Sequence, residues 1–546
     1  MNMNDEAHHF LRDFQARVQP VSKAQSIARW NLETTGEEQY IEECERLEIE
    51  LLKHYSDREV FVKVKDLRES MSDTTSHPDT ARAIDIVYRD CAGHQMSQET
   101  IEELAKRGVQ LDACYNQFRA LFKGEKVADN VIDDCLKNET DSLLVEEAWR
   151  ASKTISHFRG EGGSLAEVHQ QIRELVKVRN RGANEVGFEN YYQMSVELSE
   201  LGLDWLFETL DALAEASDEP FNTFKTDLDG QLAQRFGCDT ANLRPWHYGD
   251  RFFQTAPKAG RLNLDVVFEG RDLVDLTIKT FDALGLETRP IVDKSDLFPG
   301  DPKTSKKCQH AFCIGIDAPD DVRILCNVVD NHRWMGTMLH EFGHGVDSAG
   351  LSLELPYFFR RHAHTLTTEA IALMMERHCF NARWLQVVVG LSEKEAEQIQ
   401  SQARAEFAVK HLIFTRWVLV MCNFERALYE RPDEPDLDTL WWDLVEKYQG
   451  VTRPGPEHSE PDWASKIHLA GAPAYYQNYL LGEVFGAQLE DHIEKTFGPL
   501  ALNRRAGEFL NNEMFANGAR WPWRDLLRRL TGEDLKLEPF VAKLSG

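Results

Sequence analysis

The chain has 546 residues and a formal net charge of −29, with 42% hydrophobic and 10% aromatic residues. This composition is typical of a folded globular protein, and the negative charge argues against nucleic acid or an anionic membrane as a partner, because both attract cations. Ten cysteines are too few for a disulfide scaffold, and neither a signal peptide nor an apolar run of membrane-spanning length is evident, so we expect a cytoplasmic protein.

Most of the chain has the apolar spacing of helices, in which hydrophobic residues recur every three or four positions. Taken in chain order, helices are expected over residues 38–54, 97–123, 164–186, 190–217, 268–285, 394–430 and 474–496. Two stretches rich in proline and glycine, 286–307 and 451–463, are expected to be loops. Length alone would allow about three or four domains. Because no convincing linker or internal repeat divides the chain, we expect residues 1–546 to form a single unit.

Residues 309–329 have the pattern of a β-hairpin instead. Residues 309–316 and 322–329 are short and rich in strand-forming types, and residues 317–321 between them read Asp-Ala-Pro-Asp-Asp, a turn composition. The mainly α-helical protein therefore carries one small β-hairpin. It leads directly into the helix that holds the strongest chemical motif of the chain.

Residues 340–344 read His-Glu-Phe-Gly-His. Positions four apart lie on one face of a helix, so His340 and His344 would present two imidazoles about 6 Å apart, a spacing that suits two nitrogen ligands of one Zn²⁺. Glu341 lies one step around the helix, close enough to take a proton from a bound water. A solvated surface helix is the simpler alternative. The surrounding apolar residues disfavour it, because two buried histidines and a carboxylate would be costly without a shared partner.

A catalytic zinc site needs a third protein ligand and an open position. On the next predicted helix Glu369 lies 25 residues after His344, on an apolar turn where an unpaired carboxylate would be costly. We therefore favour Glu369 as the third ligand. Glu354 and Glu376 are the alternatives, but a solvated loop and a solvated helix face explain them more simply. Residues 332–376 would then form the zinc-binding core, with one Zn²⁺ per chain.

Further short motifs follow one another along the chain. They are Ala28-Arg29-Trp30-Asn31 with Thr34, Arg179-Asn180 with Ala183 and Gly187, Gly249-Asp250-Arg251-Phe252-Phe253-Gln254, His310-Ala311, the spacing from Pro356 to Glu369, Lys466-Ile467-His468 and Tyr476-Gln477-Asn478-Tyr479. With the zinc motif, this ordered set resembles the angiotensin-converting enzyme family of zinc peptidyl-dipeptidases. It is more distantly similar to thimet oligopeptidase and oligoendopeptidase F.

The resemblance implies a fold and a catalytic set. Two helical lobes, as subdomains of the single unit, would flank a deep active-site cleft with the metal at its floor and the hairpin beside the zinc helix. Glu341 would act as general base, and His468 and Tyr479 would donate hydrogen bonds to the developing oxyanion. A narrow cleft would admit short unstructured peptides and exclude folded proteins.

The resemblance also implies residues that bind the substrate. His310 and the hairpin edge at Ala311 would hold the peptide backbone as an added strand. Gln254, Lys466 and Tyr476 would gather the terminal carboxylate of the peptide, since a cation with two neutral donors suits that group. Such a pocket two residues beyond the cut would make the enzyme release C-terminal dipeptides.

Several positions depart from the family pattern. Asn478 stands where chloride-activated members have an arginine, so no chloride requirement is expected. The gap from His344 to Glu369 equals that of the thimet type. Ala372-Leu373 replaces a Gly-Asp pair after the third ligand, which removes a carboxylate behind the metal ligands, and Asp347 could substitute for it.

These departures leave the specificity open. We favour a peptidyl-dipeptidase, with an oligoendopeptidase that cuts internally as the nearest alternative. A helical peptide-binding scaffold that has lost catalysis is the distant one. The sequence names neither the physiological peptide nor the oligomeric state.

Overall fold

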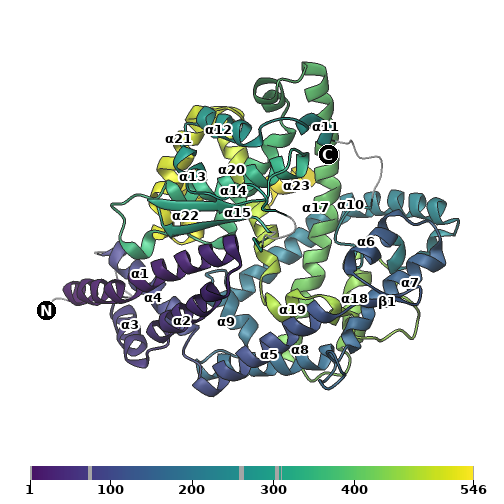
Figure 1. Cartoon of the computed structure of the whole chain (residues 1–546), viewed down its shortest axis with the longest axis horizontal. Coiled ribbons are helices and arrows are strands. Elements are labelled where there is room, and N and C mark those ends of the chain that lie inside the picture. Colours follow the sequence, from purple (N-terminus) through teal and green to yellow (C-terminus); the bar gives the residue numbers. More distant parts are fainter. Residues whose placement is uncertain (1–2, 72–76, 258–263, 302–305, 309, 545–546) are drawn as a thin grey trace. The chain divides into compact units, whose positions relative to one another are not determined.

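The computed structural model describes residues 3–71, 77–257, 264–301, 306–308 and 310–544. It is mainly helical with two small antiparallel sheets, which confirms the predicted fold class (Figure 1). The chain divides into two compact units. Unit 1 comprises Met1–Gln95, Leu262–Ala403 and Leu481–Phe540, and unit 2 comprises Met96–Arg261, Arg404–Leu480 and Val541–Gly546.

Unit 1 contains the predicted hairpin and the helices packed around it. Its elements are α1 (Met3–Thr35), α2 (Glu38–Tyr55), α3 (Arg58–Ser70), α4 (Pro78–Ala92), α11 (Asp265–Phe268), α12 (Leu273–Leu284), α13 (Arg289–Val292), β3 (Phe312–Asp317), β4 (Asp321–Leu325), α14 (His332–Ala349), α15 (Thr365–Glu376), α16 (Ala382–Trp384), α21 (Arg504–Phe509) and α22 (Trp523–Thr531).

Unit 2 is built almost entirely of helices. Its elements are α5 (Gln98–Gln117), β1 (Ala120–Phe122), β2 (Glu125–Val127), α6 (Asp129–Asn138), α7 (Ser142–Lys153), α8 (Val168–Glu185), α9 (Tyr191–Leu198), α10 (Leu203–Phe236), α18 (Leu437–Gln449) and α19 (His468–Gly471). Residues of both units contribute to α17 (Glu393–Glu430), α20 (Tyr476–Phe497) and α23 (Glu538–Leu544).

The predicted helix over 97–123 is wrong at its end. Lys123 and Gly124 have φ values of 53° and 79° and form the turn between β1 and β2, a left-handed conformation that glycine adopts without strain. The predicted helix over 190–217 is interrupted between Leu198 and Leu203, where Glu200 and Gly202 have φ values of 65° and 78°. The apolar spacing continues through both places, but the backbone turns there.

The helix α17 corrects another expectation. By length and composition it could cross a membrane, although the sequence suggested that no apolar run approaches that length. Within the protein, 72% of the apolar window is buried. The helix therefore has the burial of a core helix in a globular protein.

The hairpin forms as predicted and is anchored by α1. Phe312 pairs with Leu325 across the two strands, and the register shifts after Gly315. The Trp30 ring meets Phe312 edge-on at 6.3 Å between ring centroids and is buried with Ile316 and Leu325. Gln309, the first residue of the predicted hairpin, lies outside the described residues. The amino-terminal Trp-Asn motif thus serves to hold the hairpin.

The helix α14 carries residues 340–344 and lies beside α15 (Figure 1). Asn331 caps it by accepting a hydrogen bond from the backbone N–H of Trp334 at 2.9 Å. At Gly343 the two helices approach closely, because an added Cβ would lie 2.8 Å from Ala372 Cα and 3.3 Å from Met375 Cγ. Glycine at this position is what lets α15 reach the histidines of α14.

The close approach predicts the effect of a single methyl group. Gly343→Ala should destabilise the protein by about 1–3 kcal/mol, because the methyl must push α14 and α15 apart. Thermal and denaturant unfolding measure the change. The matched control is Gly108→Ala in α5, where an added Cβ meets nothing within 4 Å, so stability should hold or rise slightly. Equal unfolding midpoints for the two variants would contradict the close packing.

Candidate metal centre

Three side chains of unit 1 converge on one point. His340 and His344 come from α14 and Glu369 from α15, and one potential ligand atom from each lies within 4.8 Å of the others. His340 Nε2 is 3.8 Å from Glu369 Oε2. Two ligands of one tetrahedral Zn²⁺ are separated by roughly 3.3 Å, so the three residues fit a zinc ion.

The remaining imidazole nitrogens are held by other side chains of α15. His344 Nδ1 lies 2.8 Å from Thr368 Oγ1, and His340 Nδ1 lies 3.2 Å from Glu376 Oε2. These contacts fix the two ring orientations and leave Nε2 of each ring as the ligand atom. One helix therefore supplies both the carboxylate ligand and the groups that orient the histidines.

Glu376 keeps a side chain that is 36% exposed, as a solvated helix face implies, but it also contacts His340, which was not expected. It lies seven residues, or two helical turns, after Glu369 and so shares its face of α15. This i, i+7 spacing is the signal that the sequence analysis missed. Asp347, the expected substitute carboxylate, instead lies 2.8 Å from His362 Nδ1. Glu354 is exposed, as expected.

Glu341 is buried beside these residues. Burial raises the pKa of its carboxyl to about 7; within this balance the charge of His340 lowers the pKa, and the charges of Glu369 and Glu376 raise it. A carboxylate with this pKa is well matched to proton transfer near neutral pH. Burial and the charge of His340 lower the pKa of His344 to about 3, which keeps it as the neutral imidazole that binds metals.

A pocket in unit 1 lies beside the candidate metal centre. Its walls include His340, Glu341 and Glu376, together with Arg333 and Thr337 from the first turns of α14. A peptide group that enters this pocket would meet both the candidate base and a candidate metal ligand. The pocket therefore opens the half-buried His340 and the buried Glu341 to solvent.

The predicted backbone-binding residues lie at the start of β3. His310 is exposed and Ala311 directly precedes the strand. Among the described residues β4 is the only strand that pairs with β3. The pairing of a substrate peptide with the strand edge at Ala311 stays a prediction.

Unit 2 brings together the other predicted site residues. Lys466 Nζ donates a 2.7 Å hydrogen bond to Gln254 Oε1, although the two residues are 212 positions apart. The His468 and Tyr476 rings lie 4.9 Å apart, and the Tyr476 and Tyr479 rings 5.9 Å apart, measured between centroids. A cation, an amide, an imidazole and two phenols therefore form one cluster.

Two other motifs position this cluster. The Arg179 guanidinium donates hydrogen bonds to the backbone carbonyls of Leu469 and Ala470, directly after His468. Asp250 accepts hydrogen bonds from the backbone N–H of Gln254 at 3.0 Å and from neighbouring amides, which shapes the loop that carries this glutamine. The metal-binding residues and this cluster belong to different units, so the catalytic and substrate-binding roles stay predictions.

Unit 2 also holds a second His/Glu group of metal-ligand type, His157, Glu167 and His169. His157 Nδ1 lies 2.9 Å from Glu167, and its Nε2 lies 2.9 Å from Glu460. Both ring nitrogens face a carboxylate, so a protonated imidazolium between two acids explains this exposed group without a metal.

Comparisons with known proteins agree with the geometry. Residues 295–546, slightly less than half of the chain, match the profile of Peptidase family M3. The chain is 28% identical over 271 residues to thermostable carboxypeptidase 1 of Thermus thermophilus, covering 43% of this chain and 50% of the relative. It is 28% identical over 132 residues to thermostable carboxypeptidase 1 of Pyrococcus furiosus, covering 23% and 26%. The chain thus spans about half or less of the relatives it matches, and these similarities support a metallopeptidase hydrolase.

The contact with Glu376 predicts a measurable change in metal affinity. Glu376→Gln should weaken zinc binding roughly 10–100-fold. A neutral amide orients the His340 ring less firmly than a carboxylate does, and it raises the basicity of the ring less. Competition with a chelator gives the dissociation constant. The matched control is Glu354→Gln, which removes an exposed carboxylate and should leave zinc affinity unchanged. Identical zinc affinities for the two variants would show that Glu376 does not contribute to metal binding.

Proposed function

We propose that this chain is a zinc-dependent metallopeptidase that hydrolyses short unstructured peptides in the cytoplasm, with one zinc ion per chain and no chloride requirement. The observation that carries the proposal is the convergence of His340, His344 and Glu369, with the buried Glu341 beside them in an accessible pocket. The match to Peptidase family M3 supports it.

The site residues would have separate roles in amide hydrolysis. A bound zinc ion would polarise the scissile carbonyl and lower the pKa of a bound water toward ~7. Glu341 would take the proton of the attacking water and pass it to the leaving amine. His468 and Tyr479 would donate hydrogen bonds to the oxyanion, and donors of this kind are worth roughly 3–4 kcal/mol each.

Release of C-terminal dipeptides is the specificity that we propose. Its support is the ammonium group of Lys466, which is buried, touches the amide of Gln254 and makes no ion pair with any described residue. A buried cation without an ion-pair partner among the described residues can receive an anion, and the terminal carboxylate of a peptide is such a group. The printed names of the two relatives, both carboxypeptidases, point in the same direction.

The nearest alternative is an oligoendopeptidase that cuts peptides internally. The similarity to thimet oligopeptidase and oligoendopeptidase F motifs favours it, and it would use the same metal centre without a carboxylate receptor. An inactive scaffold is the distant alternative. A chain that no longer catalysed hydrolysis would have no need for the buried Glu341 beside two histidines, since burial of that carboxylate costs stability.

The role of Glu341 can be separated from that of the metal ligands. Glu341→Gln should keep one zinc per chain and lower kcat by at least about 100-fold, because the amide cannot accept the proton of water. Metal analysis and peptide hydrolysis are measured on the same sample, with Glu354→Gln as the control. A variant that keeps its zinc and a near-normal rate would exclude Glu341 as the base.

The specificity is tested with a ten-residue peptide in two forms, one with a free C-terminus and one with a C-terminal amide. A peptidyl-dipeptidase should release successive dipeptides from the free acid and should show a sharply raised KM for the amide, because the ammonium of Lys466 then has no anion to bind. Mass spectrometry identifies the products. A pair of internal fragments formed at equal rates from both peptides would instead identify an oligoendopeptidase.

A further inference from the structure

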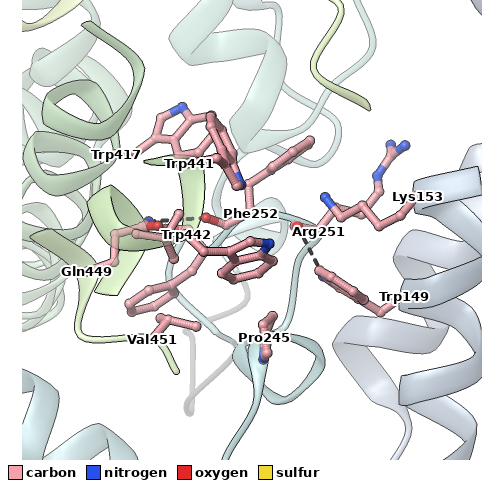
Figure 2. Close-up of a pocket in the computed structure, with 12 residues that line it drawn as sticks. Trp149, Lys153, Pro245, Arg251, Phe252, Trp417, Trp441, Trp442, Gln449 and Val451 are labelled. Carbon is pink, nitrogen blue, oxygen red and sulfur yellow. Dashed lines mark hydrogen bonds between the residues drawn. The ribbon is translucent and has the colours of Figure 1, made fainter. Parts of the chain in front are cut away.

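A second buried lysine lies near Lys466 in unit 2. Lys153 ends α7 and is 6% exposed. Its Nζ donates a hydrogen bond to Ser465 Oγ at 3.1 Å and lies 3.7 Å from the centroid of the Phe252 ring. Figure 2 shows Lys153 on one side of an aromatic pocket, with Trp441 and Trp442 among the other residues that line it.

The charge of Lys153 is not balanced by an ion pair with any residue that the structure describes. The acidic groups with the largest influence on it, Asp462 and Asp250, are engaged elsewhere. Asp462 Oδ2 accepts hydrogen bonds from Trp442 Nε1 at 3.2 Å and faces His458 Nε2 at 2.7 Å, and Asp250 accepts from backbone amides. Burial accordingly lowers the pKa of Lys153 to about 7.

Lys466 is the second cation of the pair. It is 7% exposed, and its Nζ lies 5.1 Å from the centroid of the same Phe252 ring. The two ammonium groups are therefore no more than about 9 Å apart. Two like charges buried this close repel each other. One anion bound to Lys466 would leave the charge of Lys153 without a counter-ion.

We propose that Lys153 and Lys466 together bind a C-terminal residue that carries two carboxylates, so that the enzyme prefers peptides ending in glutamate or aspartate. Lys466 takes the terminal carboxylate and Lys153 the side-chain carboxylate. This inference rests on the proposed release of C-terminal dipeptides. It adds recognition of the C-terminal side chain to a site that would otherwise bind only the terminal carboxylate of the peptide.

The dimensions agree with this assignment. The two carboxylate carbons of a C-terminal glutamate are roughly 5 Å apart when its side chain is extended. A carboxylate oxygen approaches an ammonium nitrogen to about 2.8 Å, so one glutamate can contact two ammonium groups that are up to about 9 Å apart, the upper limit for Lys153 and Lys466. A C-terminal glutamine has the same shape but would leave Lys153 without an anion. An enzyme discriminates strongly against an analogue that leaves a buried charge unpaired.

The test compares two peptides that differ only in a C-terminal Glu or Gln. The wild-type enzyme should cleave the Glu peptide with a kcat/KM at least about tenfold higher, mostly through KM. Lys153→Met should bring this ratio close to one by slowing cleavage of the Glu peptide. Lys153→Arg keeps the charge and should retain part of the preference. Lys137→Met, at an exposed position of α6, is the control and should keep the full ratio.

Each result of this test either supports or contradicts the role of Lys153. Equal kcat/KM values for the two peptides in the wild type, or an unchanged ratio in a folded Lys153→Met variant, would overturn the inference. If Lys153→Met does not fold, two other measurements test the inference. One is the ratio of kcat/KM values for the Glu and Gln peptides in Lys153→Arg. The other is product inhibition of the wild type, in which Ala-Glu is expected to inhibit at least tenfold more strongly than Ala-Gln. Poor cleavage of an amidated peptide together with equal Glu and Gln rates would overturn this inference alone. Equal cleavage of amidated and free peptides would overturn the proposed dipeptide release as well.

Discussion

The close contact between α14 and α15 at Gly343 is the constraint on which the candidate metal centre depends. An added Cβ at Gly343 would lie 2.8 Å from the backbone of Ala372, so the two helices cannot be this near with any larger residue. The short distance allows one face of α15 to reach both histidines of α14. Glu369 approaches Nε2 of His340 while Glu376 holds Nδ1 of the same ring. A metal centre with fixed ligand orientations follows from helix packing rather than from a flexible loop.

In unit 2 the second constraint is the burial of two lysine side chains that form no ion pair with any described residue, in a protein whose net charge is strongly negative. Its buried lysines Lys153 and Lys466 lie near the same aromatic ring, while their acidic neighbours bind backbone amides, an indole and an imidazole. Burying a cation without a counter-ion is costly, and proteins keep such arrangements where a ligand supplies the charge. In the proposed function the candidate metal centre of unit 1 would attack the amide, and the cationic cluster of unit 2 would bind the carboxylate.

The features of the fold that could be predicted from the sequence are local and periodic. The helices over 38–54, 164–186 and 394–430 and the hairpin were predicted to within a few residues, because apolar spacing and turn composition act over short distances. The break between Leu198 and Leu203 could not be predicted, because the apolar spacing continues while Glu200 and Gly202 adopt positive φ. The contact of Glu376 with His340 could not be predicted either, because a helical surface position and a contact with another helix look alike in a single sequence.

The sequence by itself determined the pair His340 and His344, because helix geometry places residues four apart on one face whatever surrounds them. It also determined that Glu341 stands beside them. Only the tertiary structure decided which carboxylate meets the pair, that Thr368 and Glu376 hold the rings, and that Lys153 lies near Lys466. These contacts join residues that are 24 to several hundred positions apart, and their distances depend on how whole helices pack, which no local pattern encodes.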